Sequence, residues 1–320
     1  MKGSLLRLLA CPTCRGTLRF APPYEDADTL QEGELSCEEC RARTPIRDGV
    51  PRFAGSEDYA SAFGEEWTKW PRAQLDSATG LNESREKLQA AFTFPLSELR
   101  AKEVADIGCG TGRFSEIALE EGAEVVCVDM TRAIDVARRN LEQFEKAHFI
   151  QADIFALPLR AEFDVVFSLG VLHHTPDARR AFERIVELLK PGGVISVRLY
   201  AAYNKAYIQT TEFYRRFTKR MRPSVLFKLS HIAIPLYYVN KVPALGPFIT
   251  RILLPVSVNP PTHAWRVCNT FDLYSPQYQS FHTHAEVNVW FLDAELERIR
   301  VIDPAGGVCF EGWRSPRNSD

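Results

Sequence analysis

The sequence has no long apolar run and no large excess of charge of either sign. Its strongest apolar, uncharged stretch, Leu229 to Asn240, has 12 residues and contains Pro235, whereas a membrane-spanning helix needs about 20. The opening MKGSLLRLLACPTC is too short in its apolar part, and too broken by Arg7, for a secretory signal. A net charge of -2 over 320 residues gives no general affinity for nucleic acid. We therefore expect a cytoplasmic globular protein with one large domain, alone or with a small module.

A disulfide framework of the secreted type is also absent. Of eight cysteines, four are scattered and four form two Cys-x-x-Cys pairs separated by 22 residues. Two such pairs brought together by a hairpin give four thiolates in a tetrahedron, which suits zinc; four buried thiols or labile disulfides are the alternative. Because about 50 residues with few large apolar groups cannot build a sufficient core, we predict a structural zinc site in a reducing cytosol. Its ligands are Cys11, Cys14, Cys37 and Cys40.

The first 55 residues resemble the small zinc-ribbon family that activates tRNA and translation-factor methyltransferases. The stretches that carry the resemblance are LLACPTC, LSCEEC and PIRDGVPRF. The resemblance implies a zinc-ribbon fold for residues 1–55, and it specifies the fold more closely than the function.

Residues 56–103 are expected to be a helical connector. The stretch SAFGEEWTKW carries Phe63, Trp67 and Trp70, and their spacing of four and three places them on one helix face. Such a face either packs on the core or forms an aromatic lid over a ligand, and the sequence leaves both interpretations open.

Strands and helices alternate from residue 104 onward, which is typical of a parallel, doubly wound sheet in the α/β class. Strands are expected at 103–107, 124–129, 147–153, 163–169 and 193–199, and a terminal hairpin at 298–303 and 307–313. Helices are expected at 113–122, ended by Gly122, at 131–144, N-capped by Thr131, and at 176–193, ended by a glycine. The resulting domain covers 104–320.

Residues 200–262 interrupt this rhythm as an insert. They hold nine Lys or Arg against one acid, Glu212, among many aromatic and aliphatic side chains. The charge favours an anionic partner, and the interleaved apolar residues and prolines favour a helical cap over an apolar pocket or a membrane-surface patch. A solvated cationic face on an ordinary lid helix is the alternative.

The stretch DIGCGTGRF, residues 106–114, has three glycines at every second position, which indicates a tight turn or a close approach of a ligand. No Lys-Ser or Lys-Thr follows, so it is not a Walker loop. Arg113 stands where a dinucleotide fingerprint has its third glycine. An acid followed by three alternating glycines suits a ligand with an amino group and no pyrophosphate, such as the amino-acid end of S-adenosylmethionine.

Acids end three successive predicted strands. Asp106 precedes the loop, Asp129 follows 23 residues later, where an acid accepts hydrogen bonds from ribose hydroxyls, and Asp153 can accept from an adenine amino group. Each alone could cap a helix. The three together, with the loop, predict a nucleoside cofactor site.

With these motifs in order, the chain resembles the class I S-adenosylmethionine-dependent methyltransferases, in a bacterial methyltransferase-11-like subgroup with a fused zinc ribbon. The matching stretches are VADIGCGTGRF, VVCVDMT, FIQADIFALPL, FDVVFSLGVLHHTPD and LLKPGGVISV, with AFGEEW before them and TFDLYSPQYQSFHTHAEVNVWF after. The resemblance implies a Rossmann-like, seven-stranded sheet with an antiparallel last strand. It also implies roles for particular residues. The methionine moiety is held by Asp106, Gly108, Cys109, Gly110 and Gly112; the ribose by Asp129; and the adenine region by Met130, Asp153 and Ile154, with Leu169 beside the cofactor.

Methyl transfer is an in-line displacement that needs a base only if the acceptor must lose a proton. The catalytic candidates are His173, His174 and His282, with Asp177, Tyr278, His284 and Glu286 behind them. The alternatives are structural: a histidine beside a helix start packs or caps, and Thr283 with Glu286 forms a capping box. No Asn-Pro-Pro-Tyr or Asn-Pro-Pro-Phe motif follows the fourth strand, which disfavours methylation of adenine or of a glutamine amide.

The sequence therefore favours methyl transfer to a small-molecule or lipid-linked, anionic acceptor. An RNA methyltransferase that uses the ribbon and the insert to hold phosphates is the second hypothesis, and a cofactor-binding module without methyl transfer is the third. A nicotinamide oxidoreductase is disfavoured by Arg113. Peripheral membrane contact is expected, if anywhere, through residues 200–262.

Overall fold

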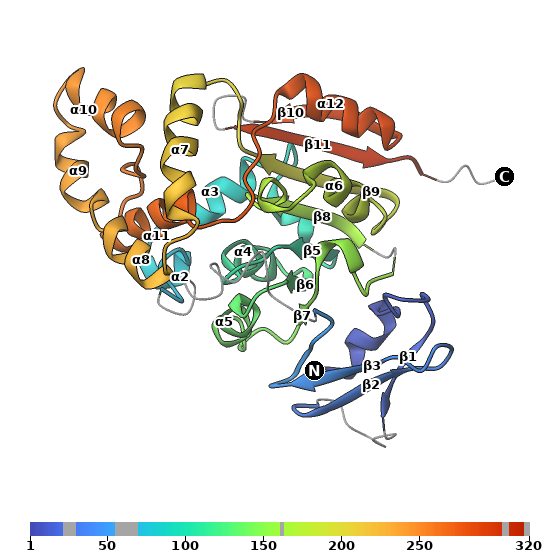
Figure 1. The fold of residues 1–320 in the computed structure, drawn as a ribbon. Helices are drawn as coiled ribbons and strands as arrows, with labels where there is room; N and C mark the ends of the chain where they lie inside the picture. Colours follow the sequence, from blue (N-terminus) through green and yellow to red (C-terminus); the bar gives the residue numbers. More distant parts are fainter. Residues whose placement is uncertain (22–29, 55–69, 161–162, 303–306, 317–320) are drawn as a thin grey trace.

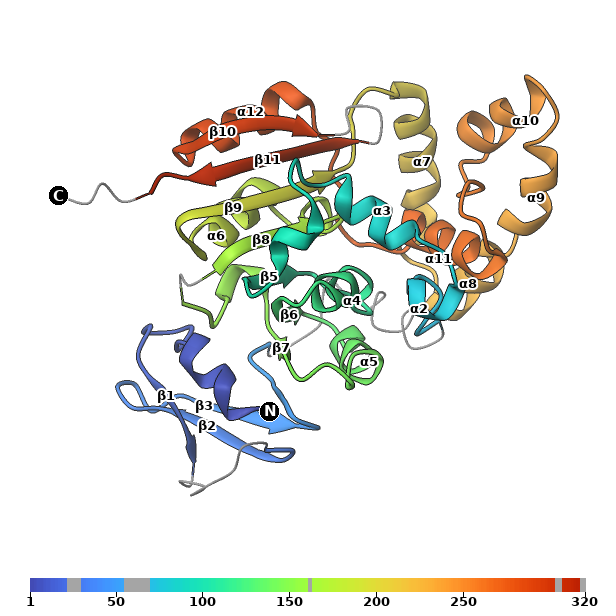
Figure 2. The same ribbon diagram turned by 180° about the vertical axis from the view of Figure 1, so that it is seen from behind.

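The computed structural model describes residues 1–21, 30–54, 70–160, 163–302 and 307–316. It has a small N-terminal sheet, a large α/β layer and a lobe of helices beside that layer (Figures 1 and 2). Phe63 and Trp67 of the predicted aromatic face lie outside the described residues, so the choice between core helix and lid stays a prediction.

The N-terminal unit is a four-stranded antiparallel sheet in the order β1-β2-β3-β4. A 3₁₀ helix, η1 (Gly3–Leu8), precedes it, and its strands are β1 (Leu18–Ala21), β2 (Gly33–Cys37), β3 (Arg43–Arg47) and β4 (Val50–Pro51). Strand β3 alternates exposed and buried residues, so this small sheet buries one face only.

The large sheet has seven strands in the order β10-β11-β9-β8-β5-β6-β7. Neighbours among β5 to β9 pair in parallel, while β11 pairs antiparallel with both β9 and β10. The bounds are β5 Glu103–Ile107, β6 Glu124–Asp129, β7 Ala147–Gln151, β8 Phe163–Leu169, β9 Leu189–Leu199, β10 Leu296–Ile302 and β11 Val308–Arg314. The predicted Rossmann-like, seven-stranded sheet with an antiparallel last strand is therefore confirmed.

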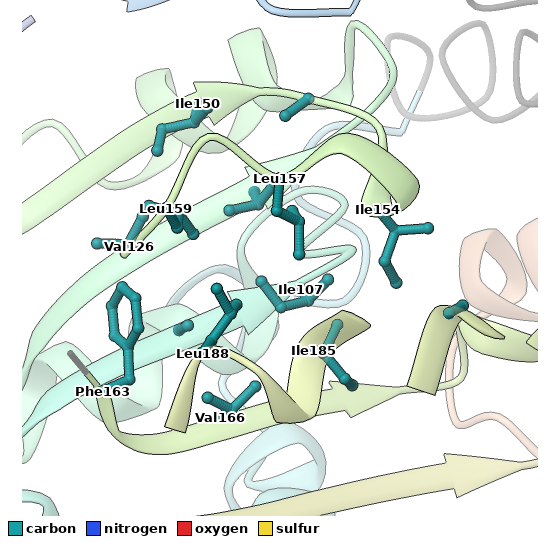
Figure 3. Packing of buried hydrophobic residues seen from close by; sticks show 14 of the residues in the cluster. Ile107, Val126, Ile150, Ile154, Leu157, Leu159, Phe163, Val166, Ile185 and Leu188 are labelled. Carbon is teal, nitrogen blue, oxygen red and sulfur yellow. The ribbon is translucent and has the colours of Figure 1, made fainter. Parts of the chain in front are cut away.

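Helices cover both faces of this sheet. One apolar cluster joins the sheet to α3 (Glu83–Gln89), α4 (Arg113–Glu120) and α5 (Ala133–Asn140). The other joins it to α6 (Ala178–Val186), α12 (His284–Asp293) and the N-terminal unit. Figure 3 shows this second cluster, where Ile185 and Leu188 lie near the sheet residue Val166. The sequences of the parallel strands are nearly continuous apolar runs because both faces of these strands are buried.

Two predicted helices, 176–193 and 131–144, are shorter than predicted. The helix expected at 176–193 ends at Val186, and the following glycines lie in the bulged start of β9, where a Cβ on Gly193 would be 2.8 Å from the carbonyl of Phe163. Pro191 has no N–H to continue the helix. The second helix begins at Ala133 with Arg132 at the N-cap, so Thr131 is not the cap, although its hydroxyl accepts a hydrogen bond from the Ala133 N–H at 3.1 Å.

The insert folds into a run of short helices beside the sheet. These are α7 (Lys205–Thr218), α8 (Pro223–Ser230), α9 (Ala233–Val239), α10 (Leu245–Phe248) and the π-helix η5 (Ile249–Leu253); α11 (His263–Tyr274) follows and packs on α7, α8 and α9. Two short helices, α2 (Asp76–Thr79) and the 3₁₀ helix η2 (Leu96–Leu99), flank α3. Among the described residues, no helix has the length and apolar character to cross a membrane.

Candidate cofactor, acceptor and metal sites

The four predicted zinc ligands converge. The Sγ atoms of Cys11, Cys14, Cys37 and Cys40 all lie within 4.8 Å of one another, with Cys11–Cys40 at 3.6 Å and Cys14–Cys37 at 3.5 Å. Zn–S bonds of about 2.3 Å in a tetrahedron place neighbouring sulfurs about 3.8 Å apart. The donor set therefore fits one structural zinc ion, with all four positions taken by protein and none left for catalysis.

Each cysteine pair lies on a tight turn that the sequence closes with an arginine. The N–H of Arg15 donates to the Cys11 carbonyl at 2.8 Å and that of Arg41 to the Cys37 carbonyl at 3.1 Å. Both arginines have positive φ, 64° and 59°, which costs a non-glycine residue free energy in the absence of a compensating interaction. For Arg15, hydrogen bonds from the guanidinium to the carbonyls of Leu157 and Leu159 help to compensate this cost.

A cavity of about 940 Å³ opens where β5 and β8 lie side by side in the large sheet. The chain order reverses here: β6 and β7 follow β5 on one side and β9 follows β8 on the other, so the cavity lies at a topological switch point, the usual ligand site of such sheets. The predicted cofactor residues that line it are Gly108, Cys109, Gly110, Asp129, Met130, Ile154 and Leu169. Asp106, Gly112 and Asp153 do not line it.

The glycine loop is closed by backbone hydrogen bonds and needs its glycines. Gly108, Gly110 and Gly112 have φ of 81°, 54° and 87°, in the region that favours glycine. A Cβ on Gly108 would overlap the side chain of Val171. The N–H groups of Gly108 and Cys109 both donate to the Val128 carbonyl, at 2.8 and 3.0 Å. Gly112 lies behind the loop, where a Cβ would be 2.7 Å from Leu141, so its structural requirement is packing.

Asp129 ends β6 and lies in the cavity wall beside the loop. Its Oδ2 accepts from the Gly110 N–H at 2.9 Å, and its Oδ1 accepts from the N–H and hydroxyl of Thr131 at 2.8 and 2.7 Å. Burial raises the pKa of this carboxyl above its ordinary value, and the three hydrogen bonds oppose that rise. A carboxylate held from both sides is positioned to accept from a ribose, and the ribose role stays a prediction.

The other two acids at strand ends have local partners. Asp106 is 2% exposed, and its Oδ2 accepts from the Ser115 hydroxyl at 2.6 Å; burial raises its pKa to about 7. Asp153 is the N-cap of the 3₁₀ helix η3 (Ile154–Ala156) and accepts from the Phe155 N–H at 3.0 Å. Their roles toward a cofactor stay predictions.

Only one of the three histidine candidates lines the cavity. His174 does, and its Nδ1 lies 3.2 Å from the Tyr278 carbonyl. Burial lowers the pKa of His174 to about 4, so the ring is neutral at pH 7. Because a carbonyl only accepts, the proton lies on Nδ1, and Nε2 is the proton-accepting nitrogen.

The other two histidines do not line the cavity, although His173 contacts the lining residue Tyr200. His173 is fully buried and stacks on Tyr200 with ring centroids 3.8 Å apart; burial holds its pKa well below the usual range. His282 is 6% exposed and bridges the Ser280 hydroxyl at 2.8 Å and the Glu286 carboxylate at 2.9 Å.

Of the two hydrogen bonds of the capping box predicted for helix α12, only one forms. Thr283 is the N-cap, and its hydroxyl accepts from the Glu286 N–H at 3.1 Å, as predicted. The Glu286 carboxylate, however, contacts His282. The cap is confirmed, and the observed carboxylate contact holds the His282 ring.

The sequence does not predict that four basic residues, from the connector, the sheet domain and the insert, meet in the cavity wall; they are Lys87, Arg113, Arg198 and Arg251. Arg113 lies 4.9 Å and Lys87 4.7 Å from the ring centroid of the buried Trp265. They come from α3, α4, β9 and η5, so no motif joins them, and only the fold brings them together.

Arg113 is the one of these four cations with buried donor atoms left unused by the described residues. Its Nη1 donates to Gln74 Oε1 at 3.0 Å, while its buried Nε and Nη2 have no hydrogen-bond partner among the described residues. Burial lowers its pKa to about 10, which leaves it charged at pH 7. A buried cation with unused donors in a cavity wall is a site for a carboxylate or phosphate.

Two family models match the sequence over the parallel strands of the large sheet and over the N-terminal unit. Residues 105–197 match the family model described as a methyltransferase domain, and residues 2–49 match that described as Trm112p-like protein. These matches confirm the predicted resemblance to a class I S-adenosylmethionine-dependent methyltransferase domain with a fused zinc ribbon.

Similar curated proteins include ubiquinone biosynthesis O-methyltransferases. The protein from Coxiella burnetii is 36% identical over 115 residues, which are 35% of this chain and 49% of that protein. The one from Pseudomonas aeruginosa is 37% identical over 116 residues, 34% of this chain and 49% of that protein. The chain thus spans about half the length of the curated relatives it matches.

Solved structures are similar over more of the chain at lower identity. Human N-acetylserotonin methyltransferase with S-adenosylmethionine is 17% identical, with a TM-score of 0.47, over 82% of this chain and 59% of that chain. A complex that contains the Haloferax volcanii Trm112 methyltransferase activator is 14% identical, with a TM-score of 0.47, over 81% of this chain and 99% of that chain.

Proposed function

We propose that this protein transfers a methyl group from S-adenosylmethionine to a hydroxyl of a small-molecule acceptor that carries an anionic group. The observation that carries the proposal is one cavity of about 940 Å³ with the glycine loop and Asp129 in its wall together with the under-satisfied cation Arg113. Hydroxyl acceptors are favoured because the relatives that match residues of the sheet are named as O-methyltransferases.

The chain's own residues would bind and orient the cofactor and the acceptor, and they would exclude water from the cavity. The loop and Asp129 would hold the amino-acid and ribose parts of the cofactor, with Met130 and Ile154 against the adenine. The bound cofactor supplies an already activated methyl group, so positioning and exclusion of water provide most of the acceleration. Arg113 and Lys87 would fix the anionic group of the acceptor. His174 Nε2 would accept the hydroxyl proton, since the ring is neutral at pH 7.

We propose that the ribbon supports the cofactor side of the sheet from within the same chain. Arg52, which follows β4, pairs with Asp135 of α5 at 2.6 Å and donates to Gln151 Oε1 at 3.2 Å. Gln151 in turn donates to the carbonyl of Met130 at 3.0 Å. The match of this unit to a Trm112p-like model, together with four thiolate ligands that need a reducing compartment, favours a cytoplasmic protein with a built-in activator.

The test uses methyl-labelled S-adenosylmethionine and a cell extract separated after reaction into RNA, protein, organic-soluble and small polar fractions. We expect label in the organic or small polar fraction. Label in RNA would replace the proposal by an RNA methyltransferase, and no label despite cofactor binding would leave a non-transferring module. Asp129→Ala is the matched control: it should abolish labelling and weaken S-adenosylhomocysteine binding in calorimetry by about 10-fold or more, the loss of hydrogen bonds to a charged group. Unchanged affinity would contradict the ribose assignment.

A further inference from the structure

The insert exposes most of the large apolar side chains that the structure leaves in water. Of the sixteen large hydrophobic side chains exposed among the described residues, twelve lie in residues 200–262. Isolated exposed apolar groups are normal, whereas such a concentration marks an interaction surface. We call this surface the cap face; it consists of Tyr203, Phe213, Phe217, Met221, Val225, Leu229, Ile232, Tyr238, Val242, Leu245, Phe248 and Leu253.

These side chains recur at helical spacing. Phe213 and Phe217 are four residues apart on α7, 52% and 57% exposed, with their rings 5.7 Å apart. Val225 and Leu229 repeat the spacing on α8. Residues four apart lie on one side of a helix, so α7 and α8 each present an apolar stripe to solvent.

The helices of the insert and their connections also carry unpaired positive charge. Of the nine cations of the insert, only Arg215 is buried; it pairs with Glu212, the one acid, and donates to the carbonyls of Leu273 and Pro276. The other eight are exposed, and within the described part of the chain no ion pair involves them; they are Lys205, Arg216, Lys219, Arg220, Arg222, Lys228, Lys241 and Arg251.

Apolar stripes beside unpaired cations fit an anionic lipid surface better than the alternatives. A second copy would bring eight like charges toward eight more, which opposes association. RNA would pair with the cations but would gain by stacking only on the five aromatic groups, leaving seven aliphatic ones in water. A bilayer interface takes both kinds of side chain.

We propose that the cap face docks on an anionic bilayer surface and that the acceptor reaches the cavity from the membrane. The link to the cavity is direct, since Tyr207 of α7 and Thr250 and Arg251 of η5 belong to the insert and line the cavity. The docking stands by itself, whereas the route of the acceptor rests on the proposed methyl transfer.

The experiment measures sedimentation of the full zinc-loaded protein with vesicles of phosphatidylcholine alone or mixed with phosphatidylglycerol. We expect binding to the mixed vesicles that weakens with added salt. Phe213→Ser with Phe217→Ser, and Lys219→Glu with Arg220→Glu, should each lower the partition coefficient at least about tenfold. None of these residues lines the cavity, so S-adenosylhomocysteine binding should stay at the wild-type level and report correct folding.

The control variants carry the same kinds of substitution at exposed positions outside the insert. Val289→Ser with Leu292→Ser removes two exposed apolar groups of α12, and Arg47→Glu with Arg139→Glu reverses two cations outside the insert; both should bind vesicles as the wild type does. Equal losses in the cap-face and control variants would overturn the proposal. So would binding to RNA but not to vesicles, or self-association that the cap-face variants abolish. Vesicle binding without methyl transfer would leave the docking intact and refute only the proposed function.

Discussion

Arg113 is a charged side chain in the cavity wall, and no residue in the described ranges makes a hydrogen bond to its Nε or Nη2. If its role is to hold an anionic acceptor, Arg113→Met should raise the KM for the acceptor at least about tenfold, the value of one charge-assisted hydrogen bond. The dissociation constant of S-adenosylhomocysteine should not change. The free energy of unfolding should change little, because the variant removes a desolvated charge with one side-chain hydrogen bond, to Gln74, and keeps much of the side-chain volume. Steady-state kinetics, calorimetry and urea unfolding measure the three quantities.

The control for Arg113 is Arg184→Met, which removes an exposed arginine paired with Glu187 on α6. It should leave KM and affinity unchanged. A weakened affinity for S-adenosylhomocysteine in Arg113→Met would assign the guanidinium to the cofactor's own carboxylate instead of the acceptor.

Asp106 gives the stability a pH dependence with a definite sign. Burial raises its pKa from 3.8 to about 7, with the Asp129 charge adding to the rise and the Ser115 hydrogen bond opposing it. Protonated Asp106 thus stabilises the folded state at low pH, and this contribution is lost as the pH rises from about 4 to about 7. Asp106→Asn keeps an acceptor for Ser115, so it should gain stability over the wild type across that window, by at most about 4 kcal/mol. Urea unfolding at pH 5 and pH 8 measures the gain; a difference between the two proteins that does not change with pH would contradict it.

At the scale of single residues, the sequence could predict the groups that are close along the chain. The alternating glycines, Asp129 at a strand end and the four cysteines are local patterns, and the fold keeps them together. Arg113 and Lys87 come together because α3 packs on α4, and both side chains contact Trp265 of α11, which is far along the chain. No period or spacing in the sequence encodes such a contact.

At the scale of elements, the ribbon and the large sheet meet at the edge strand β7. The N–H of Phe53 donates to the Gln151 carbonyl at 2.8 Å, so the chain after β4 continues the hydrogen bonding of that edge. Gln151 links this junction to Met130, which lines the cavity. The strands could be predicted from their apolar runs, but this edge contact could not, because it is an isolated bridge between Arg52 and Gln151, which lie far apart in the sequence.

Removal of Arg52 tests this junction. Arg52 is about nine-tenths buried as a side chain and contacts Asp135 and Gln151. Arg52→Ala should lower the free energy of unfolding by about 3 kcal/mol, since it leaves Asp135 as a buried unpaired charge, and should weaken S-adenosylhomocysteine binding several-fold through Gln151 and Met130. Zinc content should stay at one per chain. The control is Arg43→Ala, which removes an exposed ion pair with Glu34 and should change neither the free energy of unfolding nor the S-adenosylhomocysteine affinity. Equal affinity for S-adenosylhomocysteine in Arg52→Ala and the wild type would show that the ribbon does not support the cofactor site.

At the scale of the whole molecule, the ribbon and the sheet share one core. Leu5, Leu8 and Leu9 of the N-terminal unit belong to the same buried cluster as Leu159 and Phe163 beside the sheet. Arg7 also pairs with Glu103 and Glu124 at the starts of β5 and β6. Parts that share a buried core are expected to unfold together, so the fused ribbon differs from a module on a linker.

Loss of zinc should therefore lower the stability of the whole protein and not of the ribbon alone. Cys37→Ser removes one of four thiolate ligands, and because metal binding is coupled to the folding of such units, the whole protein should melt at a lower temperature in one transition. Differential scanning calorimetry with zinc analysis measures both effects. Cys268→Ser, at a buried cysteine outside the cluster, is the control and should keep its zinc. A separate early transition in Cys37→Ser, followed by melting of the large domain at the wild-type temperature, would show that the ribbon unfolds alone. The shared core would then contribute little to cooperativity, and support of the cofactor site would depend on the Arg52 contacts alone.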